Sequence, residues 1–384
     1  MLVANFYYPP DYEYGEIARN IVTGKGFSRT IVADTNPAPT SSHAPFYPYF
    51  LSLFYRAGNK PFIYFLVQLL QAIFSTLTIY IIYKTSQILF NSSVAHITEW
   101  LVALYPPLIY YCTKLVPTTI FLFFLCLSIY LIMKNENFFQ SLLSGIFLGI
   151  AILCDPVALV IYPAIFVWFL ISKKINFVRM TLILFVSIII LIPWTIRNYR
   201  IHKTLVPITT QFGVNLWIGN NANATGTDFY EIKSVETQDY ILVTQTLPST
   251  VQDSLNRLSE INRAKFFLYQ AFDFMVNNPH KFIVLLVKKC YYYLWFPPAT
   301  IYASTDLQKY RILLYISYIP ILVLGIAGIL LSIRGKKPVL LILLCMMLIS
   351  GLYVGSHVGL IRYRIPVELY LLCFSGYFIY SFRR

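Results

Sequence analysis

Long apolar stretches alternate with short polar connections over most of this 384-residue chain. An α-helix needs about 20 predominantly apolar residues to cross a bilayer, and the shortest spans have about 17. This length predicts nine membrane-spanning helices, near residues 62–83, 93–112, 115–133, 139–154, 157–172, 178–194, 310–333, 338–355 and 366–381. Because Asp155-Pro156 separates two short spans, 139–154 and 157–172, these two are expected to form a tight hairpin.

The composition supports this pattern. The chain is 58% apolar and only 12% charged, and its mean hydropathy is +0.64. An average soluble domain is roughly 45–50% apolar and about 25% charged. A soluble core of this size could not bury so much apolar surface. The predicted fold class is therefore an all-α polytopic membrane protein, which excludes a soluble enzyme, a disordered chain and a coiled coil.

The formal net charge of +14 predicts how the chain is oriented in the membrane. Basic residues concentrate in the short cytoplasmic loops of membrane proteins. One set of short connections carries Lys84, Lys134, Lys173, Lys174, Arg179, Arg334, Lys336, Lys337, Arg383 and Arg384, whereas the alternate set carries Lys114, Arg362 and Arg364. The first set and the C-terminus are therefore expected in the cytoplasm. No basic and aromatic nucleic-acid-binding pattern occurs, so nucleic acid is not an expected partner.

The polar stretches divide the chain into four expected parts. Residues 1–61 form an outer loop with interfacial helices, and 62–194 form a helix bundle. Residues 195–309 form an outer α+β region, and 310–384 contain the last spans. Within these parts we expect a helix near 14–23, strand-like runs soon after 195 and a helix near 250–277. The segment KFIVLLVKKCYYYLWFPP is expected to be an interfacial helix, because its three lysines make crossing the membrane costly.

Almost every polar residue capable of chemistry then lies on the outer face. A transporter would more often place such groups at the middle of the membrane, so the asymmetry favours an enzyme or receptor. Asp155 before Pro156 is typical of a helix N-cap with proline at the first helical position. The six cysteines show no CxxC spacing, and no P-loop, GxGxxG, HExxH or GxSxG pattern occurs.

Several ordered segments carry a resemblance to a known family. An acidic residue ahead of YGEIARNIVTGKGFS is followed by HAPFYPYFLSLFY, PWTIRNYR, NLWIGNNANATG and a late RYRIP. In this order they resemble bacterial family-39 glycosyltransferases of the C-type superfamily, whose relatives include the aminoarabinose transferase and the protein O-mannosyltransferases. The resemblance implies a multi-pass enzyme that takes a sugar from a polyprenyl-phosphate carrier and transfers it outside the cytoplasmic membrane.

The resemblance also implies site residues. Asp11 matches the family's acidic residue best, ahead of the tyrosine that Tyr14 resembles, and Glu13 completes a loose Asp-x-Glu pattern. A carboxylate there could act as general base on an acceptor hydroxyl, and cations could stabilise the departing lipid phosphate. Candidates for substrate binding are Tyr14, His43, Lys114, Arg197, Arg200, Arg362 and Arg364. The alternative to substrate binding for His43 is an exposed position in a loop. For Arg197 and Arg200 the alternative is that they anchor the end of a span at the lipid headgroups.

Cofactor and alternative functions stay open. No cofactor is certain, although Asp11 and Glu13 could share a divalent cation, because oxygen ligands suit such ions. The expected partners are a polyprenyl-phosphate-linked sugar and a lipid, glycan or protein acceptor. The alternatives are a lipid-linked glycan flippase or transporter, a glycan polymerase or ligase, and a non-catalytic truncated relative. The last follows because family members usually have a transmembrane helix before the acidic loop, whereas this sequence starts almost at the loop.

Overall fold

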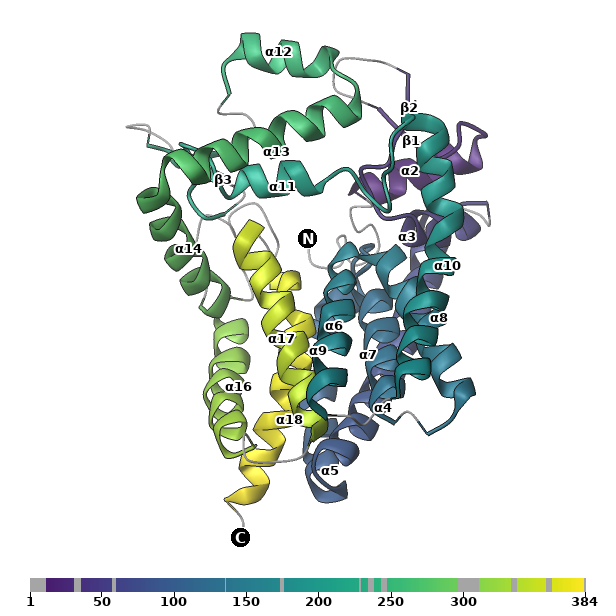
Figure 1. The fold of residues 1–384 in the computed structure, drawn as a ribbon, viewed down its shortest axis with the longest axis vertical. Helices are drawn as coiled ribbons and strands as arrows, with labels where there is room; N and C mark the ends of the chain where they lie inside the picture. Colours follow the sequence, from purple (N-terminus) through teal and green to yellow (C-terminus); the bar gives the residue numbers. More distant parts are fainter. Residues whose placement is uncertain are drawn as a thin grey trace.

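The fold is a bundle of long helices with a layer of shorter helices across one end (Figure 1). The computed structural model describes residues 12–30, 36–56, 60–134, 136–172, 176–227, 229–233, 238–242, 247–295, 311–332, 337–356 and 361–382. Helices α2, α11 and α13 lie across the end that we call the covered end, and the chain's last described helix, α18, runs to the opposite end (Figure 1).

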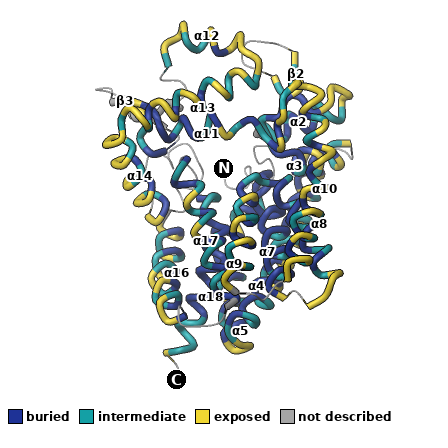
Figure 2. Tube along the Cα trace, viewed as in Figure 1, coloured by how far each residue is buried: buried dark blue, intermediate teal, exposed yellow. Residues whose placement is uncertain are grey.

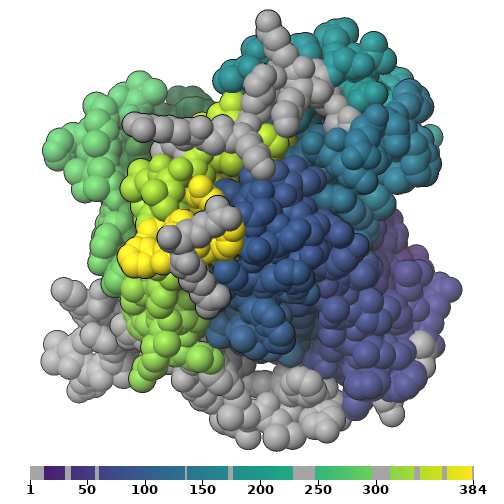
Figure 3. Space-filling model, turned by 90° about the horizontal axis from the view of Figure 1, so that it is seen from below, coloured from purple at the N-terminus to yellow at the C-terminus, as the bar shows by residue number. Residues whose placement is uncertain are grey.

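Apolar helices build the bundle. They are α4 (Lys60–Leu89), α5 (Ser92–Ala103), α6 (Pro106–Cys112), α7 (Thr118–Lys134), α8 (Phe138–Cys154), the short 3-10 helix η1 (Pro156–Val160), α9 (Ile161–Ser172), α10 (Phe177–His202), α16 (Arg311–Ser332), α17 (Lys337–Ser356) and α18 (Ile365–Ser381). The 3-10 helix η4 (Ile361–Tyr363) precedes α18. At the end opposite the covered end, α18 packs beside the turn between α4 and α5, where the rings of Phe90 and Tyr377 stack with centroids 4.3 Å apart (Figure 3).

The bundle confirms the prediction of a polytopic membrane protein. Within the described residues, four helices are long and apolar enough to cross a membrane: Lys60–Leu89, Phe177–His202, Ile312–Ser332 and Pro338–Ser356. Shorter apolar helices at Thr118–Lys134, Phe138–Cys154, Pro156–Ile171 and Ile365–Ser381 match four further predicted spans. The outward faces of α10 and α16 expose large apolar side chains, which suits contact with lipid (Figure 2).

Two predicted boundaries differ from the structure. The span predicted at 93–112 is divided into α5 and α6, because Pro106 and Pro107 cannot donate the backbone hydrogen bonds that would continue one helix. Helix α10 continues beyond the predicted end at 194 as far as His202, and Lys203 ends it in the left-handed conformation with a φ of 53°. Because α10 is longer than predicted, Arg197 and Arg200 lie on this helix, in the part that extends past the bundle.

Shorter elements form the covered end. These are α2 (Tyr12–Val22), β1 (Ser28–Arg29), β2 (Ala38–Pro39), α3 (Phe46–Phe54), α11 (Phe212–Ile218), β3 (Phe229–Lys233), β4 (Gln238–Leu242), α12 (Ser249–Arg257), α13 (Glu260–Asn277) and α14 (Pro279–Leu294). Strands β1 and β2 pair antiparallel, and so do β3 and β4. The helix predicted near 14–23 is confirmed as α2. The helix predicted at 250–277 is divided, because Ser259 caps a new helix and accepts from the Asn262 amide.

The prediction of strand-like runs soon after residue 195 was wrong. That stretch contains the end of α10 and the helix α11, and the strands come later, at β3 and β4. The physical reason is packing: Trp217 of α11 is buried against Phe267 of α13, with ring centroids 4.9 Å apart. A helix satisfies the backbone while it presents one apolar face to this contact.

Close helix packing in the bundle gives a first testable result. A Cβ atom added at Gly328 of α16 would lie 2.0 Å from the Phe374 carbonyl oxygen of α18. Gly328→Ala is therefore expected to push the helices apart and to destabilise the protein by about 1–3 kcal/mol. Thermal unfolding in detergent, followed by intrinsic fluorescence, measures the change. The control is Gly351→Ala in α17, where an added Cβ meets nothing within 4 Å; equal shifts in both variants would contradict the packing argument.

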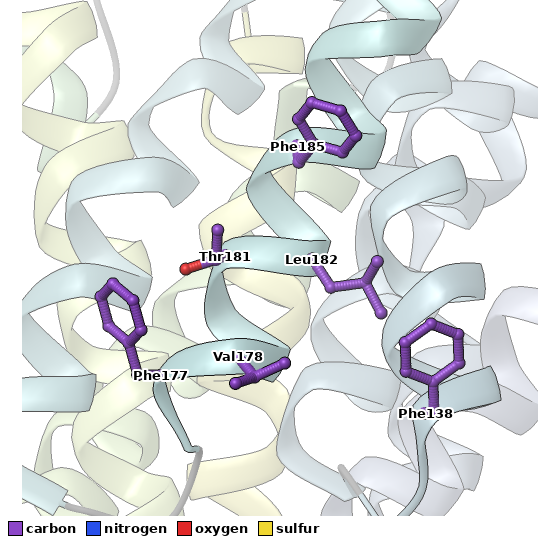
Figure 4. Close-up of a pocket in the computed structure, with 6 residues that line it drawn as sticks. All are labelled: Phe138, Phe177, Val178, Thr181, Leu182 and Phe185. Carbon is purple, nitrogen blue, oxygen red and sulfur yellow. The ribbon is translucent and has the colours of Figure 1, made fainter.

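The lipid-facing surface also carries an apolar hollow of about 320 Å³ between the starts of α8 and α10. Its lining residues are Phe138, Phe177, Val178, Thr181, Leu182 and Phe185 (Figure 4). Because none of these side chains is charged or a nucleophile suited to sugar transfer, the hollow is not a candidate for the chemistry.

Candidate active site

Helix α2 fixes Tyr14 at the centre of an aromatic cluster at the covered end. The Tyr14 ring packs edge-on against His43, with centroids 5.1 Å apart, and against Tyr47, with centroids 5.5 Å apart. The Tyr47 hydroxyl donates to Gln71 Oε1 of α4 at 2.8 Å, which joins the cluster to the bundle. Burial raises the pKa of Tyr14 to about 12, so its phenol is protonated at neutral pH.

Glu13 lies beside Tyr14 and is an ionised carboxylate. Its Oε1 lies 3.3 Å from Arg29 Nη2, and Arg29 Nε also lies 3.7 Å from Glu16 Oε2. Burial raises the pKa of Glu13, but a hydrogen bond from its own backbone amide and the nearby guanidinium groups of Arg29 and Arg362 outweigh burial, so the pKa is below its ordinary value. Glu13 thus supplies negative charge throughout the neutral range.

His43 is a neutral member of the same cluster. Its Nδ1 lies 2.9 Å from the Ser42 hydroxyl. Burial lowers the pKa of His43 to about 4, Glu13 acts against this shift, and Arg29 and Arg362 add to it. A neutral imidazole can donate one hydrogen bond and accept another. The structure therefore places His43 in a shielded cluster rather than in an exposed loop.

Arg362 brings a cation to the cluster from a distant part of the sequence. It lies in η4, and its guanidinium carbon is 5.2 Å from the centre of the Tyr363 ring, which in turn stacks on Tyr353 at 4.6 Å. The charge of Arg362 acts on Glu13, Tyr14 and His43. Segments from the two ends of the chain therefore lie close enough to interact through charge.

Asp155 completes this group of charges. It caps η1 as predicted, because its Oδ1 accepts from the Val157 amide at 3.0 Å. Burial raises the pKa of Asp155, whereas the Val157 hydrogen bond and Arg362 lower it less strongly. Asp155 also raises the pKa of Tyr14. Its capping role and its position beside the cluster are thus compatible.

Arg197 lies nearby, but its guanidinium is engaged by the protein itself. Nη1 donates to the Thr40 carbonyl at 2.6 Å, and Nη2 donates to the Phe27 carbonyl at 2.7 Å. The guanidinium also lies over the rings of Phe27 and Trp194, at 5.2 and 4.6 Å. This geometry fits a residue that holds the loop before His43. Arg200, one turn further along α10, is exposed.

Glu260 also holds this loop through hydrogen bonds. As the first residue of α13 it accepts from the Thr40 hydroxyl at 2.8 Å and from the Ser41 amide at 3.0 Å. A carboxylate at a helix N-terminus is also stabilised by the helix dipole. Arg197 and Glu260 together therefore set the position of the loop that carries His43.

Two other predicted binding residues are buried in contacts of their own. The Lys114 ammonium lies 4.7 Å from the centre of the Tyr110 ring, and this side chain is 7% exposed. Arg364 forms an ion pair with Glu368, and its Nη1 donates to the carbonyl of Trp295 at 2.8 Å. Their predicted roles in substrate binding therefore have less geometric support than that of Arg362.

The structure brings together Glu13, Tyr14, His43 and Arg362 from the predicted set and adds Asp155 and Arg29. Asp11 lies outside the described residues. In the described ranges no group of three or more histidine, cysteine, aspartate or glutamate side chains could hold a metal ion. The proposal that Asp11 and Glu13 share a divalent cation stays a prediction, because Asp11 is half of it.

Sequence reasoning missed Arg29 and Glu260. Arg29 follows a turn in which Gly24 and Gly26 have φ values of +81° and +68°, so the chain folds back from α2 and returns a basic residue to Glu13. That turn was a usable signal. Glu260 lies 219 residues after Ser41, and no local pattern links the two.

Sequence and structure comparisons relate the chain to known proteins. Residues 42–196 match the family model of dolichyl-phosphate-mannose-protein mannosyltransferases. No curated protein matches the chain in sequence.

The fold has counterparts among solved membrane enzymes. The crystal structure of ArnT from Cupriavidus metallidurans bound to undecaprenyl phosphate matches with a TM-score of 0.54 and 12% identity over 97% of this chain and 56% of that chain. The oligosaccharyltransferase AglB from Archaeoglobus fulgidus, in complex with an inhibitory peptide and a dolichol-phosphate, matches with a TM-score of 0.53 and 12% identity over 97% and 46%. This chain thus spans about half the length of either protein. The chain therefore has the fold of ArnT and AglB, and its residues 42–196 match the model of the dolichyl-phosphate-mannose-protein mannosyltransferase family.

Proposed function

We propose that the chain transfers a sugar from a polyprenyl-phosphate-linked donor to an acceptor hydroxyl at the outer face of the cytoplasmic membrane. One observation carries the proposal. Four separate segments supply Glu13 and Tyr14, His43, Asp155 and Arg362 at the covered end. The Tyr14 ring packs against His43 with centroids 5.1 Å apart, and the charge of Arg362 acts on the pKa of the other four residues. Carboxylates beside a cation are the groups that this transfer needs.

The proposed chemistry assigns each group a role. A carboxylate of the first loop, Asp11 with Glu13 beside it, accepts the proton of the acceptor hydroxyl while the hydroxyl oxygen attacks the anomeric carbon. The bond between that carbon and the phosphate oxygen breaks, and the polyprenyl phosphate leaves with the electron pair. Arg362 stabilises the charge that develops on the phosphate, because guanidinium groups match phosphate geometry. Tyr14 and His43 contact the sugar as neutral hydrogen-bonding groups.

The proposed orientation places the covered end outside the cytoplasm. It is supported by the distribution of short basic connections: α7 ends at Lys134, and Lys84 lies in the last turns of α4, both at the end opposite the cluster. Positively charged short loops favour the cytoplasmic side. ArnT and AglB were solved with undecaprenyl phosphate and dolichol-phosphate respectively, which supports a polyprenyl-phosphate donor here.

A transfer assay in liposomes tests the proposal. The protein is reconstituted with labelled undecaprenyl-phosphate-linked sugars and candidate lipid, glycan and protein acceptors. Asp11→Asn is expected to lower transfer by about a hundredfold, the usual size of a general-base effect. Glu13→Gln is expected to cause a smaller loss, because the Glu13 carboxylate is paired with Arg29.

Asp253→Asn, an exposed aspartate of α12, is the matched control and should transfer at the wild-type rate. Equal transfer by the wild type and by both first-loop variants would remove these carboxylates from the mechanism. Absence of transfer by the wild type with every sugar and acceptor would count against the proposed function itself.

A further inference from the structure

Helix α14 contains a lysine that is completely buried. Lys289 is 0% exposed, although its neighbour Lys288 and the earlier Lys281 on the same helix are exposed. The Lys289 ammonium donates to Asn220 Oδ1 at 3.0 Å and to the carbonyl oxygens of Gly355 and Ser356, each at 3.2 Å. Burying an ammonium costs free energy unless hydrogen-bond acceptors surround it, and here three acceptors do.

The contact joins three elements at the end of α17. Gly355 and Ser356 are the last residues of that helix, where unpaired carbonyl groups concentrate negative partial charge. Asn220, just after α11, donates to the Gly355 carbonyl at 3.0 Å as well as accepting from Lys289. Burial lowers the pKa of Lys289 to about 8, which leaves the side chain mostly protonated at pH 7.

The C-terminal end of α14 makes a second attachment, to Arg364, eight residues after Ser356. Arg364 Nη1 donates to the carbonyl oxygens of Tyr293 and Trp295, at 3.2 and 2.8 Å, at the C-terminal end of α14. Arg362 lies between the two attachments, six residues after Ser356 and two before Arg364. Helix α14 is thus hydrogen-bonded to the chain both before and after Arg362, the cation of the candidate site. We call these two attachments the grip of α14.

We propose that α14 sets the position of Arg362, and that Lys289 is a positioning residue for the phosphate-binding cation. The inference rests on the proposed function for the role of Arg362, but the grip itself is a property of the fold. A guanidinium must be held close to its working place to bind a phosphate well, because a shift of about 1 Å can remove most of its effect. Lys289 supplies this fixation from the N-terminal side of η4.

Hydrogen exchange tests the grip without any substrate. Lys289→Met removes the ammonium and keeps a long apolar side chain, and Lys288→Met makes the same change at the adjacent exposed position. We expect amide exchange in peptides covering 353–364 to become about tenfold faster in Lys289→Met only, the effect of losing a charged hydrogen bond. Unchanged exchange in Lys289→Met, or equal acceleration in Lys288→Met, overturns the proposal.

Asn220→Ala covers the case in which Lys289→Met does not fold. It leaves the charge but removes the Oδ1 acceptor and the link to Gly355. Exchange over 353–364 should then accelerate about threefold, as for a neutral hydrogen bond. Wild-type exchange in this variant contradicts the proposal.

Binding of undecaprenyl phosphate connects the grip to the site. Lys289→Met is expected to weaken binding about tenfold, but to add nothing when Arg362 is already glutamine, because two residues that act through one contact are not additive. Additive losses would mean that Lys289 acts elsewhere and would overturn its positioning role. If the wild type and Arg362→Gln bind undecaprenyl phosphate equally, the phosphate site of the proposed function fails, while the exchange result still decides whether α14 grips the chain.

Discussion

Replacing Arg362 with glutamine is expected to lower transfer from an undecaprenyl-phosphate-linked donor by about a hundred- to a thousandfold. Glutamine is shorter than arginine and still offers a polar amide that can donate hydrogen bonds, but it lacks the charge that stabilises the departing phosphate, and removing one such group typically has this cost. Arg362→Lys should recover part of the activity, because it restores the charge without the planar fork. Initial rates in liposomes at saturating and limiting donor measure the effect on kcat and on kcat/KM.

The control for this variant is Arg257→Gln. It makes the same change in an exposed arginine in the last turn of α12, which is not one of the candidate site residues. It should transfer at the wild-type rate and unfold at the wild-type temperature. Arg362→Gln should also unfold close to the wild-type temperature, since no ion pair with a described carboxylate involves Arg362 within the ranges that the structure covers. A loss of transfer that only follows a loss of folded protein would contradict the catalytic role.

Hydrophobic length was a sound guide to the bundle but not to its breaks. The spans predicted at 62–83 and 338–355 correspond to α4 and α17 because an uninterrupted apolar run of that length has no other stable form in a bilayer. The span predicted at 93–112 is mostly apolar, although it contains His96 and Glu99. Pro106 and Pro107 divide it, and hydropathy alone does not register a missing backbone donor.

The candidate site was predictable in its parts rather than in its assembly. Glu13 and Arg362 stood out because charge is scarce in this chain and both lie in segments that resemble a family. Lys289 did not stand out, because the sequence does not distinguish it from Lys281 and Lys288 in the same segment. The three lysines together predicted an interfacial helix, whereas in the structure Lys281 and Lys288 are exposed and Lys289 is buried. Which lysine is buried depends on where the end of α17 lies, and that contact joins residues 66 and 67 positions apart.

Replacing Arg364 with methionine is expected to destabilise the protein by about 3–5 kcal/mol, the cost of leaving a buried charge without its partner. Glu368 is 1% exposed. Without Arg364, the one side chain among the described residues that still donates to its carboxylate is Tyr105, whose hydroxyl lies 2.7 Å from Oε2. The variant also loses the guanidinium that lies 3.5 Å from the centre of the Tyr318 ring. Thermal and denaturant unfolding in detergent, with the donor absent, measures the loss.

The double variant Arg364→Met with Glu368→Leu separates charge from packing. Because it removes both ions, it should be more stable than Arg364→Met alone, as is usual when a buried ion pair is replaced by apolar groups. A double variant that is less stable than the single one would show that the other contacts of Arg364 dominate. Two arginines two residues apart are therefore expected to fail in opposite ways: Arg362→Gln loses transfer and keeps its stability, whereas Arg364→Met loses stability first. The contrast follows from their surroundings: the charge of Arg362 acts on the residues of the cluster, whereas Arg364 is buried in contacts with the end of α14 and with Glu368 of α18.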